Sequence, residues 1–204
     1  NLADFQFDEI ILYDAELRFT EDMPEGKRQA FAEEFNSQLK NIYFYHQSSM
    51  EFRFKDQIAD VTFLSAEEGM SDFIDFHTGK KQLSMPKSGE ALISSGLAKR
   101  FSVAVGDTVT VQDSNMQELT LRVSGVFDNN VYNYVVTTPS TVIAQWDKAP
   151  QVQMACVYAA DGQDVHQLGA ELSSHRDVMS VTVSEDVRES VGNMLEALDL
   201  VVVT

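Results

Sequence analysis

The two ends of the chain carry the same order of elements, a strand followed by a helix and a second strand, and this order constrains the fold more than any other feature. A strand is expected at residues 9–19. Asp22, Pro24 and Glu25 then form a helix-start signature: an acid able to cap, an early proline and an acid in the first turn. The helix is expected to run to about Leu39.

This first helix has one apolar side. Phe31, Phe35 and Leu39 recur at every fourth position, which predicts a buried stripe. Three strands are expected after it, near residues 42–45, 50–55 and 58–64.

The last fifty residues repeat the plan. Residues 152–160 and 178–183 are the expected strands, and in the second strand apolar and polar residues alternate. Asp161 is the expected cap of the helix between them, whose apolar face carries Val165, Leu168 and Leu172. A final helix is expected from about Ser184. Its apolar stripe comprises Val187, Val191, Met194, Leu195 and Leu198.

Two units of this kind usually pair into one sheet with both helices on one face, the ferredoxin-like arrangement. Between them the sequence pattern changes. Short strand patterns are separated by glycines, namely Gly89, Gly96, Gly106 and Gly125. The sequence therefore predicts an α+β fold: a ferredoxin-like lobe from residues 1–72 and 133–204, and an inserted β-rich lobe at 73–132.

The chain is strongly acidic. Its 204 residues carry a formal net charge of −17, which repels phosphate backbones and anionic lipid head groups. We therefore expect that the protein binds no nucleic acid and that it stands off from a membrane surface instead of lying flat on it.

Few residues suggest a catalytic or metal-binding role. The one cysteine, Cys156, lies in an apolar run and is expected to be a buried, inert thiol. The four histidines lack the close spacing of metal ligands, and Asp72, Asp75 and His77 are the nearest approach to a metal cluster. His166 and His175 are expected at the surface.

No catalytic motif is complete. Ser95 and Lys99 are four positions apart, whereas a serine–lysine dyad of the penicillin-binding type needs a spacing of three. The sequence has no P-loop, no GxGxxG and no GxSxG motif. We therefore expect no catalytic residue, no cofactor, no nucleotide and no metal, and do not expect an enzyme.

One stretch of the sequence carries a more specific pattern than the rest. Residues 89–101, GEALISSGLAKRF, are followed by the turn Gly106-Asp107 and a strand pattern at 108–111. The stretch resembles a segment in the extracytoplasmic domains of MacB/FtsX-type ABC transporter permeases, in which a strand leads to a short helix and Gly-Asp turns the chain into the next strand. Glycine accepts that turn conformation easily, and an aspartate can bond its own turn. A Gly-Asp turn after a short helix also occurs in double-psi and other small β-barrels.

Other segments resemble the same family in the same order. Residues 121–128 are similar to its next strand, and residues 134–146 to a later strand and short helix. Residues 5–14 and 194–203 look like the entry into, and the exit from, the second extracellular domain of large Gram-positive permeases of this class.

The resemblance implies an extracytoplasmic location and a partner, a cytoplasmic ATPase whose ATP-driven movements pass through membrane helices into the outer domain, a process called mechanotransmission. It implies extracellular peptide, lipoprotein or protein clients, and it carries no catalytic residue onto this chain. The alternatives are a ligand-sensing ectodomain for peptide antibiotics or lipid-linked precursors, and a hydrolase built on the β-rich lobe.

Two further expectations concern surfaces. The apolar residues 200–203 are consecutive, so the final helix is expected to continue into the membrane as a stiff stalk. A contact surface is expected on the β-rich lobe; the competing interpretation is that Asn129, Asn130 and Tyr132 form only a solvated loop.

Overall fold

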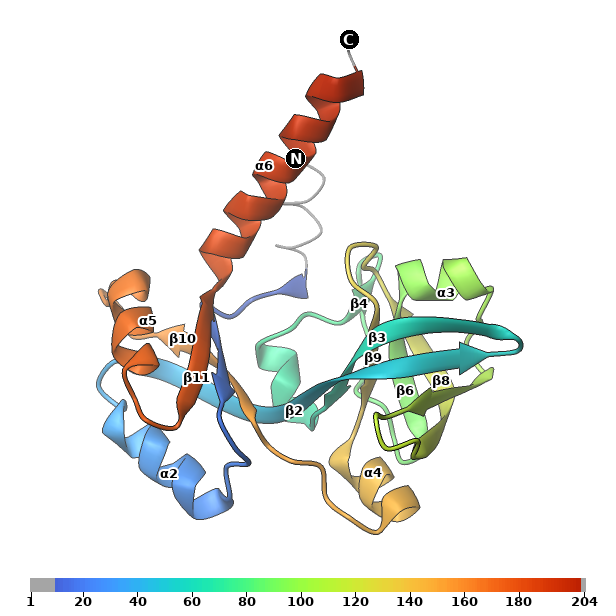
Figure 1. Cartoon of the computed structure of the whole chain (residues 1–204), viewed down its shortest axis with the longest axis horizontal. Coiled ribbons are helices and arrows are strands. Elements are labelled where there is room, and N and C mark those ends of the chain that lie inside the picture. The colour runs from blue at the N-terminus through green and yellow to red at the C-terminus, as the bar shows by residue number, and fades with distance from the viewer. Residues whose placement is uncertain (1–9, 203–204) are drawn as a thin grey trace. The chain divides into compact units, whose positions relative to one another are not determined.

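The computed structural model of the chain describes residues 10–202 (Figure 1). These residues form two compact units. The terminal unit comes from both ends of the chain, up to Phe44 and from Val152 onward, and the barrel unit spans Tyr45–Gln151. The expected strand at residues 9–19 is shorter in the structure, where β1 spans Ala15–Phe19. Residues 5–9 and 203, which belong to the segments that resemble the entry and exit of the family's domain, lie outside the described residues.

The terminal unit contains four antiparallel strands: β1 (Ala15–Phe19), the first residues of β2 (Leu39–Phe54), β10 (Met154–Ala159) and β11 (Val178–Val183). Their order in the sheet is β11-β1-β10-β2. Each strand–helix–strand unit therefore places its two strands on either side of a strand from the other unit. The expected α+β fold with ferredoxin-like order is confirmed.

Two helices pack on this sheet, α2 (Glu25–Glu34) and α5 (Val165–Ser173). Phe31 of α2 and Leu168 and Leu172 of α5 share one hydrophobic core with Leu17 and Val157 of the sheet. The ring of Phe31 meets the ring of Phe19 edge-on at a centroid distance of 5.1 Å. Burial of these side chains, worth about 1.5–3 kcal/mol each, holds the helices on the sheet.

The barrel unit is built on a closed ring of strands. In order around the ring these are β2, β3 (Gln57–Ser65), β9 (Tyr134–Thr137), β6 (Glu90–Ser94), β8 (Glu118–Phe127) and β7 (Thr108–Gln112). The ring closes because β7 also pairs with β2, with Phe52 opposite Val111. Closure leaves the ring without open edges that would invite another strand.

Short elements complete the barrel unit. They are η1 (Glu68–Asp72), β4 (His77–Thr78), β5 (Lys81–Gln82), α3 (Ser95–Phe101) and α4 (Pro139–Trp146). Phe52 and Phe63 from the strands share a core with Leu97 and Phe101 of α3 and Val142 of α4. This unit is wider than the expected segment 73–132, because β2, β3, β9 and α4 contribute to the same core.

Some local expectations are wrong. The first helix ends at Glu34, and Leu39 instead begins β2, although Phe31, Phe35 and Leu39 are all buried as expected. The two strands expected at 42–45 and 50–55 are one strand. The polar residues between them stay extended because the ladder to β3 continues there, with His46 opposite Ser65.

The helix caps also differ from expectation. Asp22 does not cap α2; its Oδ1 accepts a hydrogen bond from the backbone N–H of Val152 at 2.6 Å. Asp161 does not cap α5 either. The cap is Asp164, whose Oδ1 accepts from the N–H of Gln167 at 2.8 Å. In both places more than one acidic residue precedes the helix. The tertiary structure decides which backbone N–H group each carboxylate reaches.

Candidate functional site

The candidate dyad of Ser95 and Lys99 is not a catalytic pair. The Ser95 hydroxyl accepts from the N–H of Asn129 at 2.9 Å and lies 3.1 Å from both Asn129 O and Asn130 Oδ1. Lys99 lies one turn further along α3 and is exposed. Ser95 therefore fastens the loop after β8 to the start of α3.

That loop is not simply solvated. Asn129 is buried, and its Oδ1 accepts from the N–H groups of Val131 and Tyr132 at 3.1 and 2.8 Å. Only Asn130 and Val131 are exposed. The interpretation as a solvated loop therefore fails for Asn129, while a contact role for this lobe stays a prediction.

The histidines are dispersed. His77 is buried, and its Nδ1 lies 3.3 Å from Asp75 Oδ2. His166 is exposed, as expected, whereas His175 is largely buried. Within residues 10–202, no group of three or more His, Cys, Asp or Glu side chains is placed to hold a metal ion.

Cys156 lies at the centre of β10 with no exposed surface. Burial is the main cause that raises the pKa of its thiol well above the ordinary value, and the charge of Glu16 adds to it. The thiol is therefore protonated and unreactive at neutral pH, as the sequence indicated.

The Gly-Asp turn has the expected geometry. Gly106 has a φ of 98°, in the region that favours glycine. The side chain of Asp107 closes the turn, since its Oδ2 accepts from the N–H of Ala104 at 2.8 Å. The turn delivers the chain into β7, the strand that closes the barrel.

The helix α6 (Ser184–Val202) begins in the terminal unit and is fixed at its root (Figure 1). The buried Ser184 hydroxyl donates to Tyr13 O at 2.8 Å, and the Ser184 N–H donates to Asp14 O at 2.9 Å. Asp186 Oδ1 lies 2.8 Å from His166 Nε2 on α5. The first turn of α6 is thus hydrogen-bonded both to the segment that leads into β1 and to α5.

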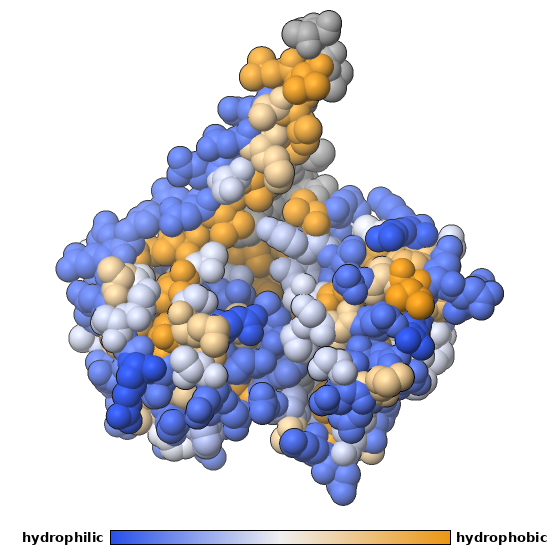
Figure 2. Space-filling view, viewed as in Figure 1, coloured by the Kyte–Doolittle hydropathy of each residue, from blue (hydrophilic) through white to orange (hydrophobic). Residues whose placement is uncertain are grey.

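Further along α6 the apolar stripe becomes exposed to solvent. Val187, Val191 and Leu195 are half-buried, whereas Leu198 and Val201 are exposed. Figure 2 shows apolar side chains gathered along one side of α6 and polar side chains along the other. The end of the helix therefore presents an apolar surface that the described residues leave open.

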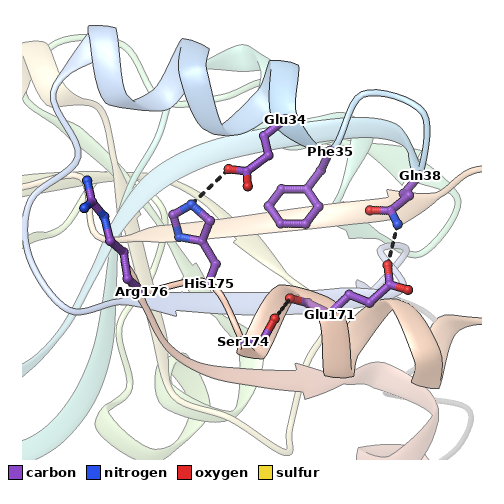
Figure 3. A pocket seen from close by; sticks show the side chains of 7 residues that line it. All are labelled: Glu34, Phe35, Gln38, Glu171, Ser174, His175 and Arg176. Carbon is purple, nitrogen blue, oxygen red and sulfur yellow. Dashed lines mark hydrogen bonds and ion pairs between the residues drawn. The ribbon is translucent and has the colours of Figure 1, made fainter.

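An open pocket of about 700 Å³ lies between the C-terminal ends of α2 and α5 (Figure 3). Its lining residues are Glu34, Phe35, Gln38, Glu171, Ser174, His175 and Arg176. His175 Nε2 lies 3.0 Å from Glu34 Oε2, and Gln38 Nε2 donates to Glu171 Oε2. The side chain of Phe35 lies between these two hydrogen-bonded pairs.

The sequence did not indicate this pocket. Glu171 and His175 are four positions apart, as are Glu34 and Gln38, but such a spacing alone does not indicate a pocket. Glu34 and Gln38 are far away in sequence and meet them only because α2 and α5 pack on the same face of one sheet.

The family of the chain follows from its sequence and fold together. Residues 16–175 match the sequence model of the MacB-like periplasmic core domain. The chain belongs to this family, as its resemblance to MacB/FtsX-type permeases indicated. No curated protein matches the chain in sequence.

The fold is shared with solved structures, of which two are examples. One is the periplasmic region of MacB from Actinobacillus actinomycetemcomitans, with 13% identity and a TM-score of 0.51; the match covers 95% of this chain and 99% of that one. The other is the extracellular domain of the noncanonic ABC-type transporter YknZ from Gram-positive bacteria, with 12% identity, a TM-score of 0.51 and coverage of 82% and 98%. At these identities the likeness concerns the fold alone.

Among the described helices, none has the length and apolar character that crossing a bilayer requires.

Proposed function

We propose that this chain is the extracytoplasmic domain of an ABC transporter permease and that it acts as a transport and interaction module, not as an enzyme. The observation that carries the proposal is the family match over residues 16–175. The partner is then a cytoplasmic ATPase, reached through the membrane part of the permease. The clients are extracellular peptides, lipoproteins or proteins.

The root of α6 supports a mechanical role. Ser184 holds the first turn of α6 on the segment that leads into β1, and the pair of Asp186 with His166 holds it on α5. A helix held in this way transmits a displacement to the sheet, whereas a flexible linker would absorb it. We therefore propose that α6 acts as a stiff stalk that couples ATP hydrolysis on the cytoplasmic side to movement of the terminal unit.

Hydrogen exchange of the full permease, assembled with its ATPase, tests this coupling. Residues 10–202 should exchange differently with and without a nonhydrolysable ATP analogue. Insertion of Gly-Gly-Ser-Gly after Asp199 should abolish that nucleotide dependence while leaving exchange in the nucleotide-free state unchanged.

The matched control places the same insertion after Asn115, in the turn between β7 and β8, where it should leave the nucleotide dependence intact. A nucleotide-dependent change that persists with the insertion after Asp199 would contradict the stalk.

A ligand-sensing role is the second candidate, and the pocket between α2 and α5 is the observation that favours it. The hydrolase alternative has less support, since the Ser95 hydroxyl is held by the loop at Asn129 and Asn130.

A further inference from the structure

The pocket between α2 and α5 combines negative charge with an aromatic surface. Both helices end beside it, α2 at Glu34 and α5 at Ser173, and neither has a basic residue in its last turn. The C-terminal end of a helix carries a partial negative charge. The two helix ends therefore add to the charges of Glu34 and Glu171.

The charge of Glu171 is not compensated. The structure gives this carboxylate two neutral donors, Gln38 Nε2 at Oε2 and Gln167 Nε2 at Oε1, the latter at 3.5 Å. Within the described part of the chain, no lysine or arginine forms an ion pair with it. A carboxylate accepts about four hydrogen bonds, so Glu171 keeps capacity for a further donor.

The partner of Glu34 is also a neutral donor. His175 Nδ1 accepts a hydrogen bond from the N–H of Asp177 at 3.0 Å, so its lone pair is occupied and the ring proton lies on Nε2. His175 Nε2 then donates to Glu34 Oε2 at 3.0 Å. In this arrangement the imidazole orients the carboxylate and leaves its negative charge in place.

Phe35 supplies the apolar part of the pocket. Its ring packs against Phe31 at a centroid distance of 4.8 Å and against His175 at 6.0 Å, which holds it between the two carboxylates. Phe35 is 8% exposed, and the part of its ring that lines the pocket beside the carboxylates can cover the methylene groups of a cationic side chain.

From this geometry we infer that the pocket binds a basic side chain, lysine or arginine, of an extended polypeptide segment. The net charge of −17 steers such a segment toward the domain. The inference deepens the proposed function, since it names the ligand chemistry of an extracytoplasmic domain. Its test uses the chain alone, so its failure leaves the coupling role of α6 untouched.

The test is a titration of the chain, followed by NMR at low ionic strength, with the peptide acetyl-Gly-Lys-Gly-Arg-Gly-amide. The peptide should bind saturably and shift the signals of Phe35 and His175. The double variant Glu34→Gln/Glu171→Gln should bind at least tenfold more weakly. Glutamine keeps an acceptor for His175 and for Gln38, so the pocket stays built while its charge is lost.

The matched control is Glu33→Gln/Glu189→Gln, which removes the same charge from exposed positions on α2 and α6 and should bind within twofold of the parent chain. Equal weakening in both double variants would overturn the site, because binding would then depend on net charge alone. Absence of saturable binding to the parent chain would overturn it as well.

A third variant distinguishes an effect on binding at the pocket from a loss of folding. Arg176 stands at the rim with 89% of its side chain exposed, and its charge repels a cationic ligand. Arg176→Ala should therefore bind the peptide about twofold more tightly, a gain that misfolding cannot produce, and weaker binding would contradict the inference. A parallel titration with putrescine, which carries two positive charges as the peptide does, distinguishes a free polyamine from a polypeptide side chain, since a polypeptide site should bind putrescine more weakly than the peptide.

Discussion

His166 Nε2 lies 2.8 Å from Asp186 Oδ1, and this contact joins α5 to the first turn of α6. The hydrogen bond that His166 donates to Asp186 is the main cause that raises the pKa of His166 above its ordinary value, and the charge of Asp186 comes next. Glu185 and Asp164 add smaller effects in the same direction. Both side chains are exposed, so the link is a weak one that depends on pH.

The first prediction concerns the pH dependence of this link. A raised pKa in the folded state means that the stabilisation is fully present below about pH 6.5 and is lost as the pH rises through the raised value. Asp186→Asn should return the pKa of His166 toward its ordinary value in an NMR titration. The stability difference between the parent chain and Asp186→Asn should be larger at pH 5.5 than at pH 8.5.

The control for the first prediction is Glu185→Gln, which removes the same charge one residue away and leaves the carboxylate that contacts His166 in place. It should lower the pKa of His166 less than Asp186→Asn does. Equal effects of the two variants would show that the contact with the Asp186 carboxylate is not the main cause.

The second prediction concerns the contact between α3 and the loop after β8. A Cβ at Gly96 would lie 3.1 Å from the Cα of Asn130, and backbone cannot move aside as a side chain does. Gly96→Ala should therefore lower the free energy of unfolding by about 1–3 kcal/mol. Urea denaturation measures the change.

Gly26 in α2 is the matched control for Gly96, because a Cβ there would meet nothing within 4 Å. Gly26→Ala should raise the free energy of unfolding by about 0.4–1 kcal/mol, since alanine restricts the unfolded chain. If both alanine substitutions changed the free energy of unfolding in the same direction, this account of the loop would be contradicted.

The third prediction concerns the turn into β7. Asp107→Ala removes the acceptor of the Ala104 N–H and should cost about 1 kcal/mol. Asp107→Asn keeps a side-chain oxygen at the same position and should cost less. Thermal unfolding of both variants tests the pair, and an equal loss in both would mean that the charge, not the hydrogen bond, stabilises the turn.

The sequence by itself determined what depends on neighbours along the chain. The apolar spacing of Leu168 and Leu172 indicated the buried face of α5, and Gly106 with Asp107 indicated the turn into β7. The start of α6 near Ser184 followed from the residues around it. These features are local, because each needs only a backbone conformation or a side chain within one turn.

Only the tertiary structure decided what depends on distant partners. Residues 46–49 continue a strand because β3 pairs with them, and Asp22 leaves α2 uncapped because Val152, distant in sequence, offers it an N–H. The pocket forms where Glu34 reaches His175, across 141 positions of sequence. No local pattern encodes such a meeting, because the order of strands in the sheet brings the ends of α2 and α5 together.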